Sequence, residues 1–419
     1  MHTEYSDYLD FDCEDNHRPR RQRKKEKQTK GRKKNSASSI TINGTNVQIW
    51  SADAVNDREL IIQVRKVTRY PGIFPHMAIM PDYNLGGLSI NGTILASENM
   101  IYINSVGGDI GCGISSLRLP LRIEDIEEHK DEIFHEMYAQ IPTGRRINVV
   151  FEQRIDSHEI FEYESPVLNN TNKKRAKQQL GTVGDGNHFV ELQADANGTI
   201  YLMVHSGSRM LGQVVRQAHA ASSIDPQSSG AIEAGTKEAE AYLRDADFAT
   251  RYAQENRREL MLRAIAVINM KVDPSKMIEP QAVIDNMLDA PHNFISTETH
   301  FGRELYVHRK GAVHVPRGNP GIIAGNMGDI SYIVMGKGNE ESFDSCSHGA
   351  GRAKTRASAL NSIRLSDYLK SVEGVVCRTD QSVLDEAPEA YRDIRKVMSY
   401  QKDLVSRLVM LYPVINIKG

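Results

Sequence analysis

The segment NSVGGDIGCGISS (residues 104–116) combines two metal-ligand residue types with several glycines. Asp109 and Cys112 are three residues apart in it. Glycines let the backbone turn tightly and approach an ion or a bulky ligand. A carboxylate and a thiol with this spacing can bind one metal ion, and a thiolate sulfur can bridge two. The segment alone leaves open a second interpretation, a buried cysteine in a glycine-rich turn.

Three histidines add to this set: His188 in GTVGDGNHFVE, His205 in VHSGSR and His292 in APHNF. Each stands beside small or polar turn residues at the end of a hydrophobic run, and strand ends commonly present ligands. With the carboxylate and the thiol they make a candidate set of five metal ligands.

The segment DSCSHGAGR (residues 344–352) places His348 between small residues, with Arg352 four residues later to meet a phosphate. A neutral imidazole can attack phosphorus, and the resulting phosphoramidate is a good donor of the group it carries. Cys346 is an alternative nucleophile, but it would need a lowered pKa. We favour His348, with a role as metal ligand still open at this point.

Familiar nucleotide and metal motifs are absent from the sequence. It contains no GxxxxGK[ST] phosphate loop, no HExxH and no KxDG of lysine-adenylylating ligases. A nucleotide, if bound, must be held in another way.

The elements that position these residues alternate along the chain. Short β-branched runs such as IIQVRKV, TIYLMVHS and ELYVHR, separated by Gly- and Asn-rich turns, predict strands, and the stretch from about 231 to 270 predicts a helix. The sequence contains no repeat of 20 to 50 residues, which argues against a solenoid or a propeller. We expect a mixed α/β (α+β) domain with packed β-sheets and outer helices, in which loops at strand ends form a metal cleft.

Composition is that of a globular protein, with 40% hydrophobic and 25% charged residues among 419. The longest apolar runs are well short of the roughly 20 residues of a membrane helix. The acidic start is no secretory signal, and four scattered cysteines make no disulfide framework. We therefore expect a cytoplasmic protein with no membrane contact.

The charge is unevenly distributed. Residues 1–34 hold eleven Lys or Arg against seven acids, a local charge of +4, which leaves about −6 for the rest of a chain of formal charge −2. We expect residues 1–45 to be a disordered acidic-then-basic tail and residues 46–419 to be one catalytic domain. The tail is either merely solvated or a non-specific contact for RNA phosphates.

Seven segments, in the same order and from about residue 50 to the last residue, resemble the RtcB family of RNA ligases. They are MPDYNLGG, VGGDIGCG, GTVGDGNHFVE, VHSGSR, HFGRELYVHRKGAV, GNEESFDSCSHGAGR and the terminal Lys418-Gly419. The resemblance implies an RtcB-like ligase domain. It also implies that one Mn²⁺ is held by Asp109, Cys112 and His188, and a second by Cys112, His205 and His292.

By the same resemblance, GTP supplies a GMP group that becomes attached to His348, and Asp82 joins it as a catalytic residue. Glu191 and Lys418 would read the guanine, and Phe189 and Tyr391 would stack near it or serve as ordinary core aromatics. The full set of implied nucleotide contacts is Asn187, His188, Phe189, Val190, Glu191, His292, Asn293, Ala324, Gly325, Asn326, Met327, Ser331, Gly349, Ala350, Gly351, Tyr391 and Lys418.

The implied reaction joins an RNA end with a 2′,3′-cyclic phosphate or 3′-phosphate to an end with a 5′-hydroxyl, in RNA repair or tRNA splicing. Two metal ions suit both displacements. The resemblance leaves open an activating or release-factor-like protein partner.

Departures from the family pattern point to a specialised paralogue. The family usually has a histidine after the Pro-Asp pair and then Gly-Lys-Gly, whereas this chain has Asn84 and then Gly86-Gly87-Leu88, and Asn326 replaces a serine. These changes could alter RNA-end binding. Two alternatives are a metal-dependent RNA-end phosphoesterase that needs no nucleotide, and a catalytically idle RNA-binding paralogue.

Overall fold

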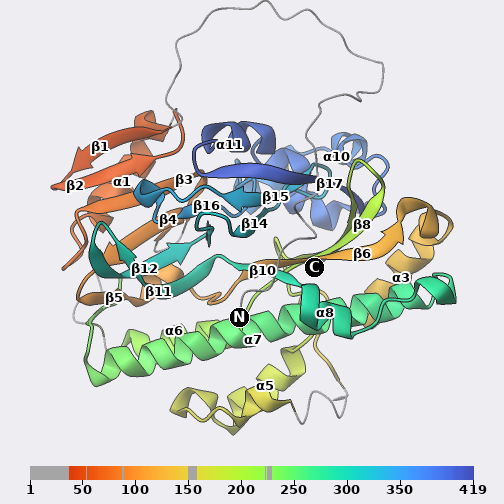
Figure 1. The fold of residues 1–419 in the computed structure, drawn as a ribbon, viewed down its shortest axis with the longest axis horizontal. Coiled ribbons are helices and arrows are strands. Elements are labelled where there is room, and N and C mark those ends of the chain that lie inside the picture. Colours follow the sequence, from red (N-terminus) through yellow and green to blue (C-terminus); the bar gives the residue numbers. More distant parts are fainter. Residues whose placement is uncertain (1–36, 53, 87–88, 150–157, 222, 224–228) are drawn as a thin grey trace, which may run out of the picture.

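The structure is a computed structural model that describes residues 37–52, 54–86, 89–149, 158–221, 223 and 229–419. Two large β-sheets lie at its centre (Figure 1). The predicted disorder of residues 1–36 lies outside the described residues.

The first sheet has six strands and carries one side of the site. It is antiparallel except for the parallel pair β2 and β3. In spatial order its strands are β1 (Ser38–Ile42), β2 (Thr45–Ile49), β3 (His76–Gly86), β4 (Ser89–Ser97), β12 (Arg303–Lys310) and β11 (Asn293–His300).

The second sheet has seven strands and is antiparallel throughout. Its order is β10 (Leu288–Pro291), β6 (Gly113–Arg122), β8 (Thr199–Ser206), β7 (Phe189–Ala194), β17 (Val405–Lys418), β15 (Ser331–Gly336) and β14 (Pro320–Ile323). Two small pairs complete the strands: β13 (Ala312–His314) with β16 (Ser345–Ser347), and β5 (Met100–Tyr102) with β9 (Ala231–Glu233).

Apolar side chains of both sheets share one core. Ala78 and Ile94 of the first sheet pack in the same cluster as Met203 and Ile333 of the second. Burial of this kind contributes roughly 25 cal/mol for each Å² of apolar surface removed from water. The two sheets are therefore held as one body, which confirms the predicted mixed α/β domain of packed sheets with outer helices.

The long helix α7 (Lys237–Asn269) runs along the lower side of the molecule in Figure 1. Thr236 caps its N-terminus by accepting a hydrogen bond from the N–H of Ala239. Leu260, Met261 and Ile265 pack against the second sheet together with α3 (Lys130–Gln140). The helix thus packs against the second sheet, next to the strand ends that carry the metal-ligand candidates.

The remaining helices cover the sheets and their edges. They are α1 (Arg58–Val67), α2 (Ile103–Val106), α5 (Asn170–Gln179), α6 (Met210–Ala220), α8 (Gln281–Asn286), α9 (Arg356–Ser362), α10 (Leu365–Ser371) and α11 (Ile394–Tyr400). In the described part of the chain no helix has the length and apolar character to cross a membrane.

Three local predictions need correction. IIQVRKV lies in helix α1, not in a strand, because Asp57 caps the helix and Leu60, Val64 and Val67 are buried along one face. The helix expected from residue 231 begins at Lys237, since residues 231–233 form β9. Residues 38–45, assigned to the tail, form strand β1, a turn and the first residue of its partner β2.

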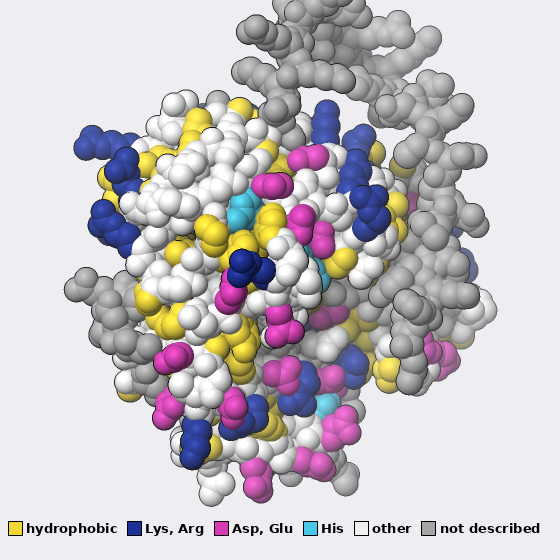
Figure 2. Space-filling view, turned by 60° about the vertical axis from the view of Figure 1, so that its left-hand side comes forward, with side chains coloured by type: hydrophobic (Ala, Val, Ile, Leu, Met, Phe, Trp, Pro, Cys, Tyr) yellow, Lys and Arg dark blue, Asp and Glu magenta, His cyan; other side chains and the backbone are white. Residues whose placement is uncertain are grey.

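Other local predictions are confirmed. TIYLMVHS is β8, and ELYVHR lies within β12. On the face drawn in Figure 2, acidic and basic side chains are mixed, with Lys and Arg gathered in groups near the upper left and upper right. No single sign of charge dominates that face.

Candidate active site and metal centre

The five metal-ligand candidates meet at neighbouring strand ends of the second sheet. Asp109 and Cys112 lie on the loop before β6, and His188 directly precedes β7. His205 lies near the end of β8, and His292 between β10 and β11. Because β10, β6, β8 and β7 are adjacent in this order, residues far apart in sequence come together there.

The ligand atoms form two groups that share one sulfur. Asp109, Cys112 and His188 make one group and Cys112, His205 and His292 the other, with all ligand atoms of a group within 4.8 Å of one another. The Sγ atom of Cys112 lies 3.4 Å from Nε2 of His188 and 3.3 Å from Nε2 of His205. This is the grouping that the sequence resemblance implied.

Hydrogen bonds orient two of the imidazoles toward the cluster. Nδ1 of His188 lies 3.0 Å from the carbonyl of Val183, and Nδ1 of His205 lies 3.1 Å from the carbonyl of Asn187. A carbonyl can only accept, so each Nδ1 carries the proton and each Nε2 presents a lone pair. Both rings are thus held in the tautomer that a metal ligand requires.

Unsatisfied polar atoms also favour bound cations. Oδ1 of Asp109 and Nδ1 of His292 are buried and have no hydrogen-bond partner within the described ranges. Buried polar groups are nearly always paired, so each such atom calls for an explanation. A metal ion beside them would supply the missing partner.

The electrostatics of the cluster fit divalent metals. Burial lowers the pKa of His205 and of His292 well below the usual histidine value, so both rings are neutral. Burial, and then the charge of Asp109, raises the pKa of the Cys112 thiol. Such a thiol loses its proton when a cation binds. The donor set of carboxylate, thiol and neutral imidazoles therefore suits a pair of divalent ions.

Helix α7 holds the metal-ligand loop in place. Gly111 has a φ of +74°, and a Cβ atom there would lie 2.6 Å from the Cα of Thr250 on the helix. From the same helix, Arg257 donates to the carbonyls of Gly111 and Ser206 at 2.8 and 3.0 Å. Its guanidinium is also paired with Asp289 at 2.7 Å. The positions of the ligand side chains thus depend on the close packing of α7 against the loop that carries Asp109 and Cys112.

His348 and Asp82 form a second centre next to the metal-ligand cluster. Nδ1 of His348 lies 2.6 Å from Oδ2 of the fully buried Asp82, which also accepts from the backbone N–H groups of His348 and Gly349. The His348 ring lies 4.7 Å, centroid to centroid, from that of His292. The negative carboxylate beside Nδ1 favours a proton on that nitrogen, which leaves the lone pair of Nε2 for chemistry.

Asp82 also sets the basicity of the histidine. Burial lowers the pKa of His348, but the negative charge of Asp82 and its hydrogen bond outweigh burial, so that the pKa is raised overall. Cys346 is different, because burial raises the pKa of its thiol and the side chain is 0% exposed. Of the two candidate nucleophiles in this segment, the structure favours His348.

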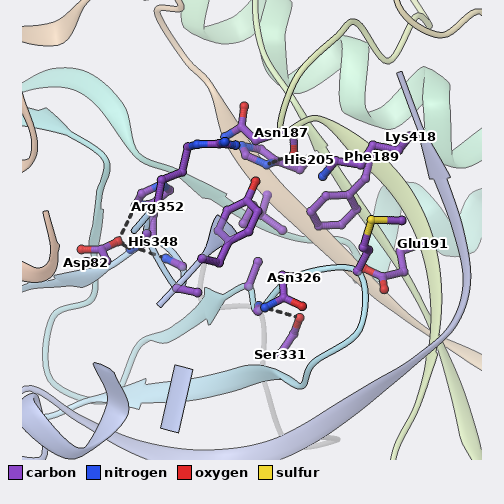
Figure 3. Close-up of a pocket in the computed structure, with 18 of the residues that line it drawn as sticks. Asp82, Asn187, Phe189, Glu191, His205, Asn326, Ser331, His348, Arg352 and Lys418 are labelled. Atoms are coloured by element: carbon purple, nitrogen blue, oxygen red, sulfur yellow. Dashed lines mark hydrogen bonds and ion pairs between the residues drawn. The ribbon is translucent and has the colours of Figure 1, made fainter. Parts of the chain in front are cut away.

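A single pocket joins these centres to most of the predicted nucleotide contacts. Its empty volume, counted to its mouth and including open solvent, is about 790 Å³. Figure 3 shows Asp82 and His348 at one end and Glu191, Phe189 and Lys418 at the other. The predicted residues that line it are Asp82, Asn187, Phe189, Glu191, His205, Ala324, Gly325, Asn326, Met327, Ser331, His348, Gly349, Ala350, Gly351, Tyr391 and Lys418.

Four predicted nucleotide contacts do not line this pocket. His188 and His292 lie in the metal-ligand cluster, and the side chain of Val190 is fully buried in the core beneath the sheet. Asn293 donates to the carbonyl of Asp109 at 3.1 Å and accepts from the N–H of Gly311 at 2.9 Å. Its side chain therefore supports the metal-ligand loop.

Glu191 lies buried at the far end of the pocket. It is 3% exposed, and its Oε1 has no partner among the described residues. Burial raises the pKa of Glu191 to about 8. Gln193 donates to its other oxygen at 3.2 Å. The unpaired oxygen points to a donor supplied by a ligand.

Glu386 was not predicted, although it organises the rim of the pocket. Its carboxylate, 2% exposed, contacts three cations, with Lys418 at 3.0 Å, Arg352 at 2.8 Å and Arg356 at 2.6 Å. Burial opposes its charge, but the cations and the hydroxyl of Tyr391 hold the pKa of Glu386 at about 2. Nothing in the sequence around it distinguishes it from a surface acid.

Five further residues line the pocket outside the predicted nucleotide contacts: Asn84, Asn91, Ile114, Arg352 and Asn416. Only Arg352 among them was predicted to meet a phosphate. Asn84, one of the departures from the family pattern, donates to the carbonyl of Arg352 at 3.2 Å. Asn326, the other, accepts from the N–H of Gly328 at 3.0 Å and so stabilises its turn. Gly87 and Leu88 lie outside the described residues.

Comparisons with known proteins place the chain among relatives of one family. A family model described as tRNA-splicing ligase RtcB matches residues 63–419. The chain is 32% identical over 407 aligned positions to the RNA-splicing ligase RtcB of Escherichia coli (strain K12), covering 91% of this chain and 99% of that protein. It is 30% identical to the tRNA-splicing ligase RtcB of Nanoarchaeum equitans, covering 89% and 95% respectively.

Proposed function

The chain belongs to the RtcB family, and from this premise we propose that it is a GTP- and Mn²⁺-dependent RNA ligase acting through a guanylyl group on His348. It would join RNA ends with a 2′,3′-cyclic phosphate or 3′-phosphate to ends with a 5′-hydroxyl. The observation that carries the proposal is the pairing of His348 with Asp82 beside two groups of metal-ligand candidates.

In the first step His348 is the nucleophile. With its Nδ1 proton held by Asp82, Nε2 attacks the α-phosphorus of GTP, the N–P bond forms, and the P–O bond to pyrophosphate breaks. Metal ions held by the five ligands would supply positive charge to the phosphate oxygens during these displacements. Asp82 stabilises the positive charge that develops on the ring.

The far end of the pocket suits guanine. An ionised Glu191 can accept from the two adjacent N–H donors of the base, and Lys418 can donate to its carbonyl oxygen. Lys418 already lies over the ring of Phe189, 5.9 Å from its centroid. Adenine presents the opposite pattern at these positions, so the pocket would discriminate against ATP.

A second groove beside the pocket suits the RNA ends. It shares Asn84 and Arg352 with the pocket and is also lined by Lys354, Arg356 and Arg392. Arg352 and Arg356 are paired with Glu386, whereas Lys354 and Arg392 form no ion pair with an acid of the described ranges and can meet RNA phosphates. The RNA 3′-phosphate would take GMP from His348, and the 5′-hydroxyl would then attack that phosphate, form the new P–O bond and release GMP. We place this activity in RNA repair or tRNA splicing.

A ligation assay tests the proposal. Two synthetic RNAs, one ending in a 3′-phosphate or a cyclic phosphate and one starting with a 5′-hydroxyl, are incubated with the protein, Mn²⁺ and GTP. We expect joined product with GTP, none with ATP, none without metal, and none from His348→Ala. Hydrolysis of the cyclic phosphate without joining and without GTP would indicate a phosphoesterase. RNA binding with no chemistry would indicate an idle paralogue.

A further inference from the structure

A further groove lies away from the proposed active site. All the charged residues that line it are Lys or Arg. It lies between α11, the start of β17 and the end of β15, with an empty volume of about 980 Å³ counted to its mouth. Its lining residues are Tyr332, Lys337, Arg395, Met398, Ser399, Lys402, Val405, Ser406 and Arg407. We call it the α11 groove.

Three of the four cations are free to bind an anion. Lys337, Lys402 and Arg407 are exposed, and none forms an ion pair with an acid of the described ranges. Lys337 donates to the carbonyl of Lys402 at 2.6 Å, and the guanidinium of Arg407 lies 3.9 Å from the sulfur of Met410. The fourth, Arg395, is paired with Asp329 at 2.7 Å. The groove thus holds uncompensated positive charge.

The positive charge of the α11 groove contrasts with the net charge of the rest of the chain. Residues 35–419 carry a net charge of about −6 and therefore repel a polyanion as a whole. The face in Figure 2 mixes acids and bases. A groove lined by four cations and no acid is a surface to which a polyanion could bind despite the negative net charge of residues 35–419.

The groove is built by elements that also build the nucleotide pocket. Ser331 lines the pocket and the next residue, Tyr332, lines the groove, because successive residues of a strand point to opposite faces. Strand β17 begins at the groove with Val405 and ends in the pocket with Lys418. From Arg407 to Lys418 the strand spans about 36 Å at roughly 3.3 Å per residue. A chain of several nucleotides could reach from one to the other.

We propose that the α11 groove binds the phosphodiester backbone of the RNA substrate at a distance from the reacting ends. The inference rests on the proposed RNA ligase function. The charged groups that line the groove stand at the ends of flexible side chains. The ring of Tyr332 is only 2% exposed, so the groove offers no aromatic face on which a base could stack. Phosphate contacts position a nucleic acid without reading its sequence. Binding there is therefore independent of sequence and sensitive to salt.

The test compares two triple variants of the full chain that change the net charge equally. One is Lys337→Gln, Lys402→Gln and Arg407→Gln in the groove. The matched control is Arg118→Gln, Lys237→Gln and Lys370→Gln, three exposed cations that line neither the groove nor the pocket. Arg395 is left unchanged because its pair with Asp329 could contribute to folding.

Binding of a labelled single-stranded RNA of about 30 nucleotides is followed by fluorescence anisotropy over a series of salt concentrations. For three lost phosphate contacts we expect the slope of log affinity against log salt to fall by about 2, and affinity at low salt to fall roughly 10- to 100-fold. The control should bind like the wild type. Guanylylation of the groove variant by GTP should be unchanged.

The proposal would be overturned by a groove variant that binds RNA with the affinity and salt slope of the control. If that variant had also lost binding of labelled poly-glutamate, measured in the same way, the groove would be assigned to an acidic protein instead. Failure of the proposed ligase function is a separate outcome, since it would abolish labelling and joining in the wild type while the RNA-binding difference persisted.

Discussion

Cys112 is the residue on which the metal-ligand contacts converge. Its sulfur belongs to both groups of candidates and lies within 3.4 Å of two imidazole nitrogens. A shared ligand couples the two ions, because its loss removes one donor from each. The site should therefore fail as a unit when this sulfur is removed.

We predict that Cys112→Ala loses bound metal and guanylylation together. Metal content is measured by elemental analysis of the purified protein, and labelling with radioactive GTP. Cys346→Ala is the matched control, a buried cysteine outside the metal-ligand groups, and should retain both. Labelling at the wild-type level in Cys112→Ala would refute the two-metal assignment.

We predict that GTP binding depends on pH through Glu191. With its pKa raised to about 8 by burial, the free side chain is protonated at pH 7 and can accept from guanine only after losing its proton. The affinity for a non-reactive GTP analogue should therefore rise between pH 6.5 and 8.5, by at most about tenfold per pH unit. Calorimetric titration measures this. Glu191→Gln should bind more weakly and without that dependence, and a flat profile in the wild type would contradict the assignment.

The sequence indicated the metal-ligand candidates and His348 because each lies among small or polar turn residues, a local signal. Glu386 had no such signal, since its importance comes from Lys418, Arg352 and Arg356, which reach it from elsewhere in the chain. The supporting role of Asn293 likewise depends on a contact with Asp109 across 184 residues. Local patterns identify reactive groups, whereas partners that position them are tertiary facts.

At the scale of elements, α7 supports the metal-ligand loop through one fully buried side chain. Arg257 is 0% exposed, and its ion partner Asp289 is 12% exposed. Removing one partner of a buried pair leaves the other charge uncompensated. The helix and the loop should therefore be coupled through this contact.

We expect Arg257→Ala to lower the free energy of unfolding by about 3 to 5 kcal/mol. Chemical denaturation gives the value. Arg258→Ala, its neighbour in the sequence, removes a partly exposed pair with Glu255 and should cost no more than about 1 kcal/mol. Equal losses in the two variants would show that the Arg257 contacts do not support the fold as described.

Sequence patterns predicted some elements and not others for a physical reason. The runs in β8 and β12 are β-branched, and both were correctly predicted as strands. The run in α1 also contains β-branched residues, but Asp57 caps it and its buried residues are spaced as on a helix. The composition of this run favours a strand. The N-cap at Asp57 and the helical spacing of its buried residues explain why it forms a helix instead.

At the scale of the whole molecule, the site lies where the two sheets meet. Asp82 comes from β3 of the first sheet, whereas Cys112 and His205 come from strand ends of the second. The strand order could not be derived, because it depends on pairs such as β4 with β12, which are about 200 residues apart. The packed mixed fold followed from the alternation of strand and helix patterns.

Metal binding should stabilise this whole body. An ion that binds the native state and not the unfolded chain raises stability by mass action. We predict that a chelator lowers the melting temperature of the wild type, and that added Mn²⁺ restores it. Cys112→Ala should show no response to either. A wild-type melting temperature indifferent to both additions would contradict the presence of bound metal in the folded protein.

The most direct test of the central claim is labelling with α-³²P-GTP and Mn²⁺, followed by denaturing electrophoresis of the wild type and His348→Ala. Our account predicts an acid-labile label on the wild type, as expected of a phosphoramidate, and none on the variant. A label that persists in His348→Ala, or a metal-loaded wild type that takes no label, would contradict the guanylyl-histidine.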